Sequence, residues 1–185
     1  MSATTIARWR DWSGTGIEHL VLREDEDGVV AESALLGTTE AGAVFAVRYR
    51  ISCDASWRVR ELGISPVGDA RRFELVGDGA GNWRNDAGVP MPEFAGAIDV
   101  DLAVTPFTNT LPIQRLGLVI GATAEIVVVY VSFPDLAVST ERQRYTRVAE
   151  RRYRFESVDS DFVREIDVDE RGLVLTYPGL FRREL

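Results

Sequence analysis

The chain has 185 residues, and a chain of that length buries about 70% of its unfolded surface without needing a metal or a disulfide. Apolar residues make up 45% and charged residues 27%, the balance of a globular protein. The 29 acidic and 21 basic residues give a net charge of −8, which argues against nucleic acids and anionic membranes as partners, because binding them needs positive charge.

Apolar and polar residues alternate along much of the chain, which predicts β-strands with one buried face. The alternation is clearest where apolar side chains occupy every odd position from Ala43 to Cys53. Residues 126–131 are apolar at every position and predict a central strand covered on both faces. In chain order, the segments that predict strands are 18–21, 43–53, 126–131, 153–156 and 173–177.

Two further observations complete the predicted architecture. Residues 139–150 fit either a helix with a capping box or a strand, and we favour the strand. Turn residues such as Asp27-Gly28 and Arg171-Gly172 separate the apolar segments at short intervals. The pattern predicts an all-β protein, a single domain over residues 1–185, folded as an antiparallel roll, barrel or sandwich with little helix.

Rare residues exclude several chemistries. Every basic residue is arginine, so a Walker A phosphate loop, a Schiff-base lysine and a protein kinase are excluded. With one cysteine, Cys53, and one histidine, His19, the chain can form neither an internal disulfide nor a four-ligand structural zinc site. The N-terminus has no apolar stretch typical of a secretory signal, and no apolar run approaches the length of a membrane span. We therefore expect a cytoplasmic protein with no integral membrane association, no metal and no cofactor.

Residues 105–116 form the least ordinary segment. Pro106 and Pro112 interrupt any strand and enclose Thr108, Asn109 and Thr110. This composition predicts a stiff polar loop that could bind hydroxyl groups. The alternative is a loop whose side chains satisfy their own backbone.

Candidate acid/base and charged groups each have a structural alternative. Asp99 and Asp101 would share one face of a strand, where they could act on a substrate or simply pair with arginines. His19 lies in a predicted strand without a catalytic motif, which favours a structural role. The glycine-rich segment 78–83 reads as a turn rather than a dinucleotide site. The arginines of residues 142–154 favour cross-strand ion pairs over an anion-binding groove.

The segment P-F-T-N-T-L-P-I-Q-R-L at residues 106–116 resembles the central signature of a bacterial family of unknown function labelled "putative glycolipid-binding". The other stretches that resemble this family are 53–60, 78–79 with 81–83, 99–102, 143–146, 153–157, and 172–174 with 177–181. The resemblance implies a strongly curved antiparallel sheet rolled into an incomplete barrel, similar to the bacterial lipoprotein-localisation carriers. It implies no catalytic residues.

The leading hypothesis is a non-enzymatic protein that binds a lipid or glycolipid in the cavity of the rolled sheet. Three groups of residues are expected to contact the ligand. Trp57, Trp83 and Phe107 would supply apolar or stacking surface, and Arg60 and Arg115 would bind an anionic head group. Thr108, Asn109 and Thr110 would bind sugar hydroxyls. The alternative is a hydrolase or isomerase of a sugar-like or lipid-like substrate, with acid/base groups among Asp99, Asp101, Glu18 and His19. A third hypothesis is an interaction module whose exposed sheet edge pairs with a partner or with a second copy, giving a homodimer.

Overall fold

The computed structural model describes residues 2–39 and 41–185. They form one sheet of fourteen strands, two short 3₁₀ turns and a single α-helix, which confirms the predicted all-β class. The strands are β1 Ala3–Asp11, β2 Ile17–Glu24, β3 Gly28–Thr38, β4 Val44–Asp54, β5 Val59–Pro66, β6 Phe73–Gly77, β7 Trp83–Asn85, β8 Asp99–Leu102, β9 Thr123–Val131, β10 Val138–Ala149, β11 Arg152–Ser157, β12 Val163–Val168, β13 Val174–Tyr177 and β14 Phe181–Arg183. The 3₁₀ turns are η1 Pro92–Phe94 and η2 Phe107–Asn109, and the helix is α1 Thr110–Leu116.

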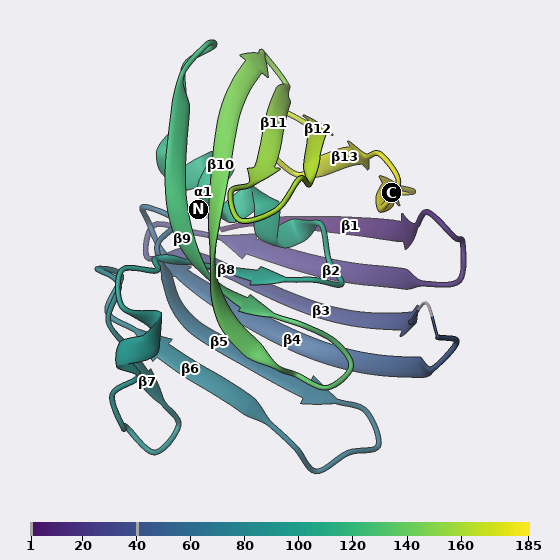
Figure 1. Cartoon of the computed structure of the whole chain (residues 1–185), viewed down its shortest axis with the longest axis vertical. Coiled ribbons are helices and arrows are strands. Elements are labelled where there is room, and N and C mark those ends of the chain that lie inside the picture. Colours follow the sequence, from purple (N-terminus) through teal and green to yellow (C-terminus); the bar gives the residue numbers. More distant parts are fainter. Residues whose placement is uncertain (1, 40) are drawn as a thin grey trace.

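The chain begins in the middle of its own sheet. The strand order is β7-β6-β5-β4-β3-β2-β1-β14-β13-β12-β11-β10-β9-β8, so β1 pairs with β2 on one side and with β14 on the other. Within the described residues every strand pair is antiparallel except β8 with β9. The sheet curls so that β9 and β10 run crosswise over β3–β5 (Figure 1). It is not closed, and the expected incomplete roll is confirmed.

The predicted alternation holds in the central strands. On β4, Val47, Tyr49 and Ile51 are buried while Arg48 and Arg50 are exposed. All but the last of residues 139–150 lie in strand β10, as favoured from the sequence, with an irregularity between Arg147 and Ala149 where it pairs with β11. Period-two burial is what gives each half of the curled sheet one dry face and one wet face.

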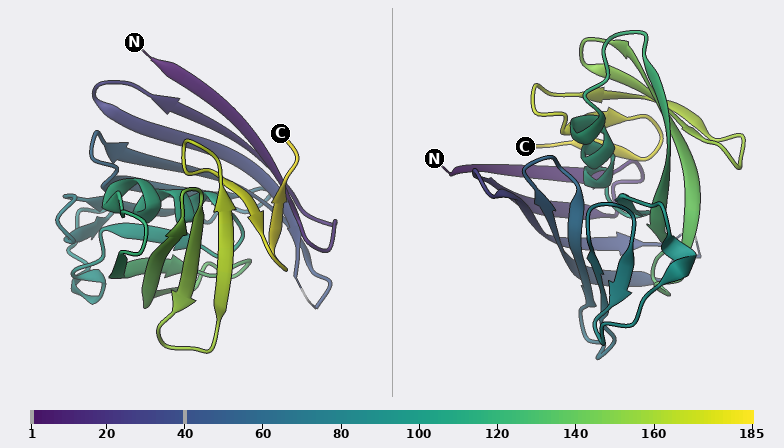
Figure 2. Two further views of the ribbon diagram at one scale, coloured as in Figure 1. Left: turned by 90° about the horizontal axis from the view of Figure 1, so that it is seen from above. Right: turned by 90° about the vertical axis from the view of Figure 1, so that its left-hand side faces the viewer.

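Residues 107–116 of this segment are helical, which corrects the expected stiff loop. Pro106 and Pro112 lie before or within its first turns, where a missing N–H costs little, and Gly117 ends α1 with a φ of 53°. Phe107 and Leu111 pack in the core of β1–β8, whereas Ile113 packs in the core of β10–β13. The helix thus fills the angle between the two halves of the sheet (Figure 2, right).

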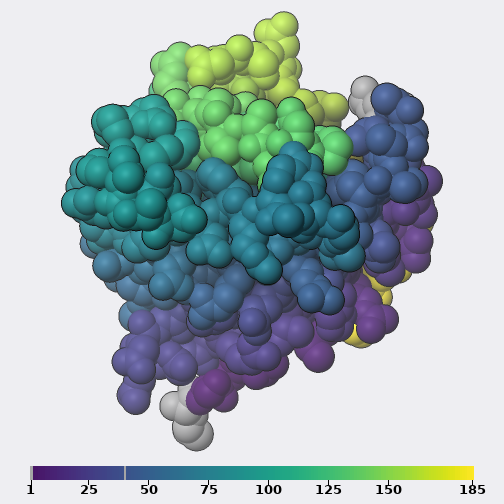
Figure 3. Space-filling model, turned by 90° about the horizontal axis from the view of Figure 1, so that it is seen from below, coloured from purple at the N-terminus to yellow at the C-terminus, as the bar shows by residue number. Residues whose placement is uncertain are grey.

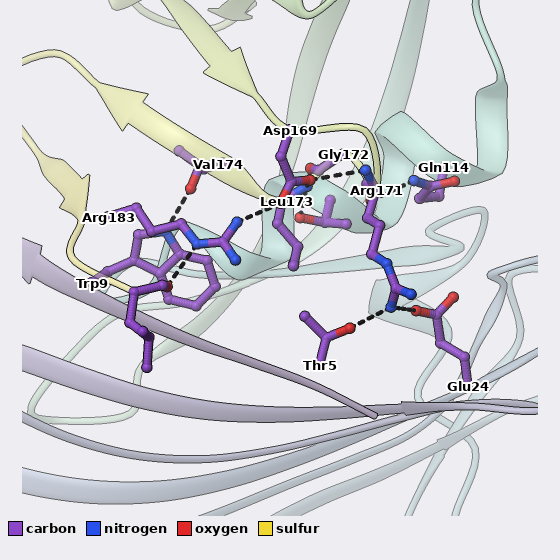
Figure 4. Close-up of polar contacts among 12 residues, drawn as sticks. Thr5, Trp9, Glu24, Gln114, Asp169, Arg171, Gly172, Leu173, Val174 and Arg183 are labelled. Carbon is purple, nitrogen blue, oxygen red and sulfur yellow. Dashed lines mark hydrogen bonds and ion pairs between the residues drawn. The ribbon is translucent and has the colours of Figure 1, made fainter. Parts of the chain in front are cut away.

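Polar contacts hold the β12–β13 turn against β1 and β2, where the two halves of the sheet meet (Figure 4). Arg171 bonds Thr5 and reaches Glu24 at 3.2 Å, and Trp9 Nε1 donates to the Val174 carbonyl at 2.7 Å. Gln114 of α1 donates to the Arg171 carbonyl at 2.5 Å. Strands at opposite ends of the chain are therefore fixed at a defined angle. Among the described helices, none is long and apolar enough to cross a membrane.

Candidate functional site

A cavity of about 830 Å³ lies at one end of the roll, between the two halves of the sheet, and is called the hollow below. It is lined by the ends of β1, β2, β3 and β9, the start of β4, the segment after β8 and the turn before β14. Its lining residues are Trp9, Asp11, Trp12, Ser13, Thr15, Gly16, Ile17, Glu18, Leu35, Leu36, Gly37, Thr38, Thr39, Phe45, Ala103, Val104, Tyr130, Phe133, Gly179, Leu180 and Phe181. Most of the large side chains among them are aliphatic or aromatic.

A glycine shapes one wall of the hollow. Gly37 pairs with Phe45 in the β3–β4 register, and a Cβ at Gly37 would lie 2.4 Å from Cζ of the Phe45 ring. The ring therefore lies across the bare backbone of Gly37, and it stacks on Phe133 with centroids 6.3 Å apart. The β9–β10 turn that carries Phe133 is itself seated on the β5–β6 loop, where Arg71 Nη1 approaches the Asp135 carbonyl at 3.4 Å (Figure 3).

Glu18 is the buried polar residue of the hollow, with 3% of its surface exposed. Its Oε1 accepts hydrogen bonds from Ser33 Oγ at 2.7 Å and from Tyr49 Oη at 2.5 Å. Its Oε2 has no partner among residues 2–39 and 41–185. Burial raises the pKa of the Glu18 carboxyl, and the nearby hydroxyl groups of Thr105, Tyr49 and Ser33 oppose this increase. The site thus contains a carboxyl group that holds its proton more tightly than a carboxyl group in water and that is hydrogen-bonded through one oxygen only.

The rim of the hollow is apolar and exposed. Trp12 is 53% and Leu36 57% exposed, and Leu180 is also exposed. The backbone N–H of Trp12 donates to the Leu180 carbonyl at 2.8 Å, which ties the β1–β2 turn to the β13–β14 turn. Asp11 lies beside them; burial would raise its pKa, but hydrogen bonds from Gly16, Ser13 and neighbouring groups outweigh this and keep the pKa below its usual value.

The Thr–Asn–Thr residues expected to meet sugar hydroxyls are buried, and they bond other parts of the protein. Thr108 Oγ1 donates to Asp101 at 2.9 Å, and Asn109 Oδ1 accepts from Tyr145 Oη at 3.0 Å. Thr110 Oγ1 donates to the Gly172 carbonyl at 3.0 Å. Phe107, which precedes them, is fully buried in the core.

The two expected arginines are held by protein groups. Arg115 forms a bidentate ion pair with the buried Asp99, with its Nη2 at 2.5 Å and its Nε at 3.0 Å from the carboxylate oxygens. Arg60 Nε donates to the Gly77 carbonyl at 3.1 Å, and its Nη1 lies 3.8 Å from Asp54.

The two expected tryptophans lie near the other end of β4 and β5. Trp83 is buried and its Nε1 donates to the Ala97 carbonyl at 2.7 Å. Trp57 is half-buried in the β4–β5 turn with a φ of 60°. None of the eight residues expected to contact a ligand belongs to the described lining of the hollow. Their role in ligand binding therefore stays a prediction.

The expected acid/base groups are dispersed. Only Glu18 lines the hollow, whereas His19 accepts a hydrogen bond from Arg8 Nε at 3.1 Å. Asp101 accepts from Gln143 Nε2 at 2.6 Å in addition to Thr108. Most of the arginines of residues 142–154 form ion pairs with neighbouring strands or turns, as favoured above: Arg142 with Glu125 and Asp159, Arg144 with Glu125 and Glu156, Arg151 with Glu170, and Arg152 with Glu165 and Asp167.

The sequence carried two usable signals for the hollow. Glu18 falls in register with Leu20 and Leu22 on β2, so alternation places a carboxyl group on the dry face. Trp12 directly before the turn residues Ser13-Gly14 was a second signal, because a large apolar side chain rarely belongs to a solvated turn. The remaining lining comes from six strands and the segments that connect strands, which only the fold brings together.

The comparisons with known proteins agree with this architecture. A crystal structure of a DUF1089 family protein from Pseudomonas aeruginosa is 39% identical and superposes with a TM-score of 0.83, covering 92% of each chain. No curated protein matches the chain. The model of the family described as "Putative glycolipid-binding" matches residues 6–183. Nearly the whole chain is covered by that match, and the protein therefore belongs to the "Putative glycolipid-binding" family.

Proposed function

We propose that the protein is a non-catalytic binding protein that holds the apolar part of a lipid or glycolipid in the hollow. The observation that carries the proposal is a cavity of about 830 Å³ with a mostly apolar lining and a single buried carboxyl group. Small-molecule sites have volumes of about 300–1,000 Å³, an apolar lining and a few placed polar groups. The family description supports the same class of ligand.

The arrangement supports binding rather than catalysis. The enzymatic alternative would be favoured by at least two of Asp99, Asp101, Glu18 and His19 in one pocket, and of these the hollow contains Glu18 alone. Asp99 is engaged by Arg115, and both carboxylate oxygens of Asp101 already accept hydrogen bonds. The other carboxyl group that lines the hollow, Asp11, lies at the rim and accepts hydrogen bonds from Ser13 and Thr15.

The exposed rim supports uptake of an apolar chain. Trp12, Leu36 and Leu180 leave apolar surface in water at the mouth of the hollow, where a bound chain would cover it. Covering such surface contributes roughly 25 cal/mol per Å². The hollow can therefore bind an acyl or alkyl chain without any strong polar contact.

The proposal is tested with the uncharged fluorescent probe N-phenyl-1-naphthylamine, which becomes bright in apolar surroundings. We expect saturable one-to-one binding that dodecyl glucoside displaces. Ala103→Trp places an indole into the hollow from a residue that is exposed to it, and should weaken probe binding at least about tenfold, as expected when several apolar contacts are lost.

Ala87→Trp is the matched control, because Ala87 lies in an exposed turn outside the hollow. It should leave probe binding as in the wild type. Equal binding by wild type and Ala103→Trp, or no saturable binding by the wild type, would refute the proposal.

A further inference from the structure

The lining of the hollow contains acidic side chains and no basic one among its described residues. Among its described lining residues the ionisable acids and bases other than tyrosine are Asp11 at the rim and Glu18 in the interior, and no arginine or histidine is present. The 21 arginines of the chain lie elsewhere, many in ion pairs with carboxylates. An anionic head group entering here would leave water without gaining a cation, which is unfavourable.

The hydrogen bonds of Glu18 define the polar group that the hollow can accept. Oε1 already accepts from Ser33 and Tyr49, so a proton on the carboxyl group belongs on Oε2. Oε2 has no partner in the described part of the chain, although Glu18 is more than nine-tenths buried and lines the hollow. A protonated carboxyl group donates one hydrogen bond, and the oxygen of a hydroxyl, ether or carbonyl group would accept it.

We propose that the hollow selects a ligand whose polar group is uncharged, and that Glu18 is the residue that sets this preference. The inference rests on the proposed function and specifies the class of ligand. An uncharged group takes the place of the anionic head group expected from the sequence. The two arginines assigned to that head group, Arg60 and Arg115, lie outside the hollow and bond the Gly77 carbonyl and Asp99.

The other ionisable groups near Glu18 do not change the sign of this argument. Tyr49 on β4 donates to Oε1, and Tyr130 on β9 and Asp11 on β1 line the same hollow. Burial is also the largest cause that raises the pKa of Tyr49 and of Tyr130, so both phenols stay neutral while Glu18 titrates. Raising the pH therefore adds negative charge at Glu18 and strengthens the rejection of an anion.

The test compares two surfactants with the same chain, dodecyl glucoside and dodecanesulfonate, each below micelle-forming concentrations and each displacing N-phenyl-1-naphthylamine. The sulfonate keeps its charge between about pH 5 and pH 9, so any pH effect belongs to the protein. Wild type should prefer the glucoside by at least about tenfold, with a preference that increases with pH, because like charges in a desolvated site are strongly unfavourable. Glu18→Gln keeps a donor but cannot ionise, and its preference should be smaller and independent of pH.

Glu93→Gln controls for net charge, because Glu93 is exposed and lies outside the hollow. It should retain the wild-type preference. Equal affinities of wild type for the two surfactants would overturn the selection while leaving the proposed function intact. An unchanged preference and pH profile in Glu18→Gln would remove Glu18 from the role. If neither surfactant binds wild type, the proposed function itself fails.

Discussion

The two halves of the molecule each contain a buried carboxyl group, and the two groups differ in how many of their oxygens are hydrogen-bonded. Asp99 on β8 is surrounded by protein, and the Arg115 guanidinium bonds both of its oxygens. Glu18 on β2 is equally buried, yet only Oε1 is bonded and the hollow lies beside it. Both oxygens of Asp99 are hydrogen-bonded, as is usual for a buried carboxylate. Glu18 instead has one oxygen that can still bond a ligand in the hollow.

The largest expected effect comes from breaking the completed pair. Asp99→Ala leaves the Arg115 guanidinium, whose side chain is 15% exposed, without its carboxylate, and should destabilise the fold by about 3–5 kcal/mol in urea unfolding. Arg142→Ala is the matched control, because it breaks only exposed pairs and should cost at most about 1 kcal/mol. Comparable losses in the two variants would mean that Asp99 and Arg115 are not a buried structural pair.

An intermediate effect is expected at the wall of the hollow. Gly37→Ala puts a methyl group against the Phe45 ring and should cost about 1–3 kcal/mol in unfolding free energy, because the ring must move off its neighbour Phe133. Gly63→Ala on β5 meets open space and should change stability by less than about 1 kcal/mol. A Gly37→Ala variant as stable as Gly63→Ala would show that the ring is not held across the backbone.

The smallest effect sharpens the comparison through pH. Because the folded pKa of Glu18 is raised above its ordinary value of 4.5, the folded state holds this proton more tightly than the unfolded chain. The resulting stability is fully present below about pH 4.5 and is lost as the pH rises through the folded pKa. Glu18→Gln cannot ionise and does not lose this stability. The unfolding free energy of the variant should therefore increase relative to that of the wild type as the pH rises. A constant difference across the pH series would contradict the raised pKa.

Local patterns in the sequence predicted more of the fold than of the site. Alternation from Ala43 to Cys53 gives the strand and its buried face, since every second side chain is apolar. The helix after Pro106 was missed. The side chains of Thr108, Asn109 and Thr110 donate to Asp101, to the Pro106 carbonyl and to the Gly172 carbonyl, and the sequence does not show these partners. The family resemblance supplied the curled sheet, which no local pattern specifies.

The hollow lay beyond sequence reasoning for a different reason. A cavity is a space that the surrounding side chains do not fill. Residues as far apart in the sequence as Trp12, Phe45 and Phe133 line this one. Residues such as Trp83, Thr108 and Thr110 suggested a site because of their chemistry, although their side chains form hydrogen bonds within the protein. The inward position of Glu18 was one of two local signs, and alternation alone could not show that its second oxygen would stay unbonded.

The pairing of β1 with β14 has a consequence for the order of folding. Asp11 and Phe181 are partners in that ladder, and both line the hollow. On the ribosome the first strand must therefore wait for the final segment before its second edge is covered. Contacts of such long sequence separation form late and open early. We expect amide exchange at Phe181 to report release of the C-terminal strand, a local opening that would widen the cavity without unfolding the rest of the sheet.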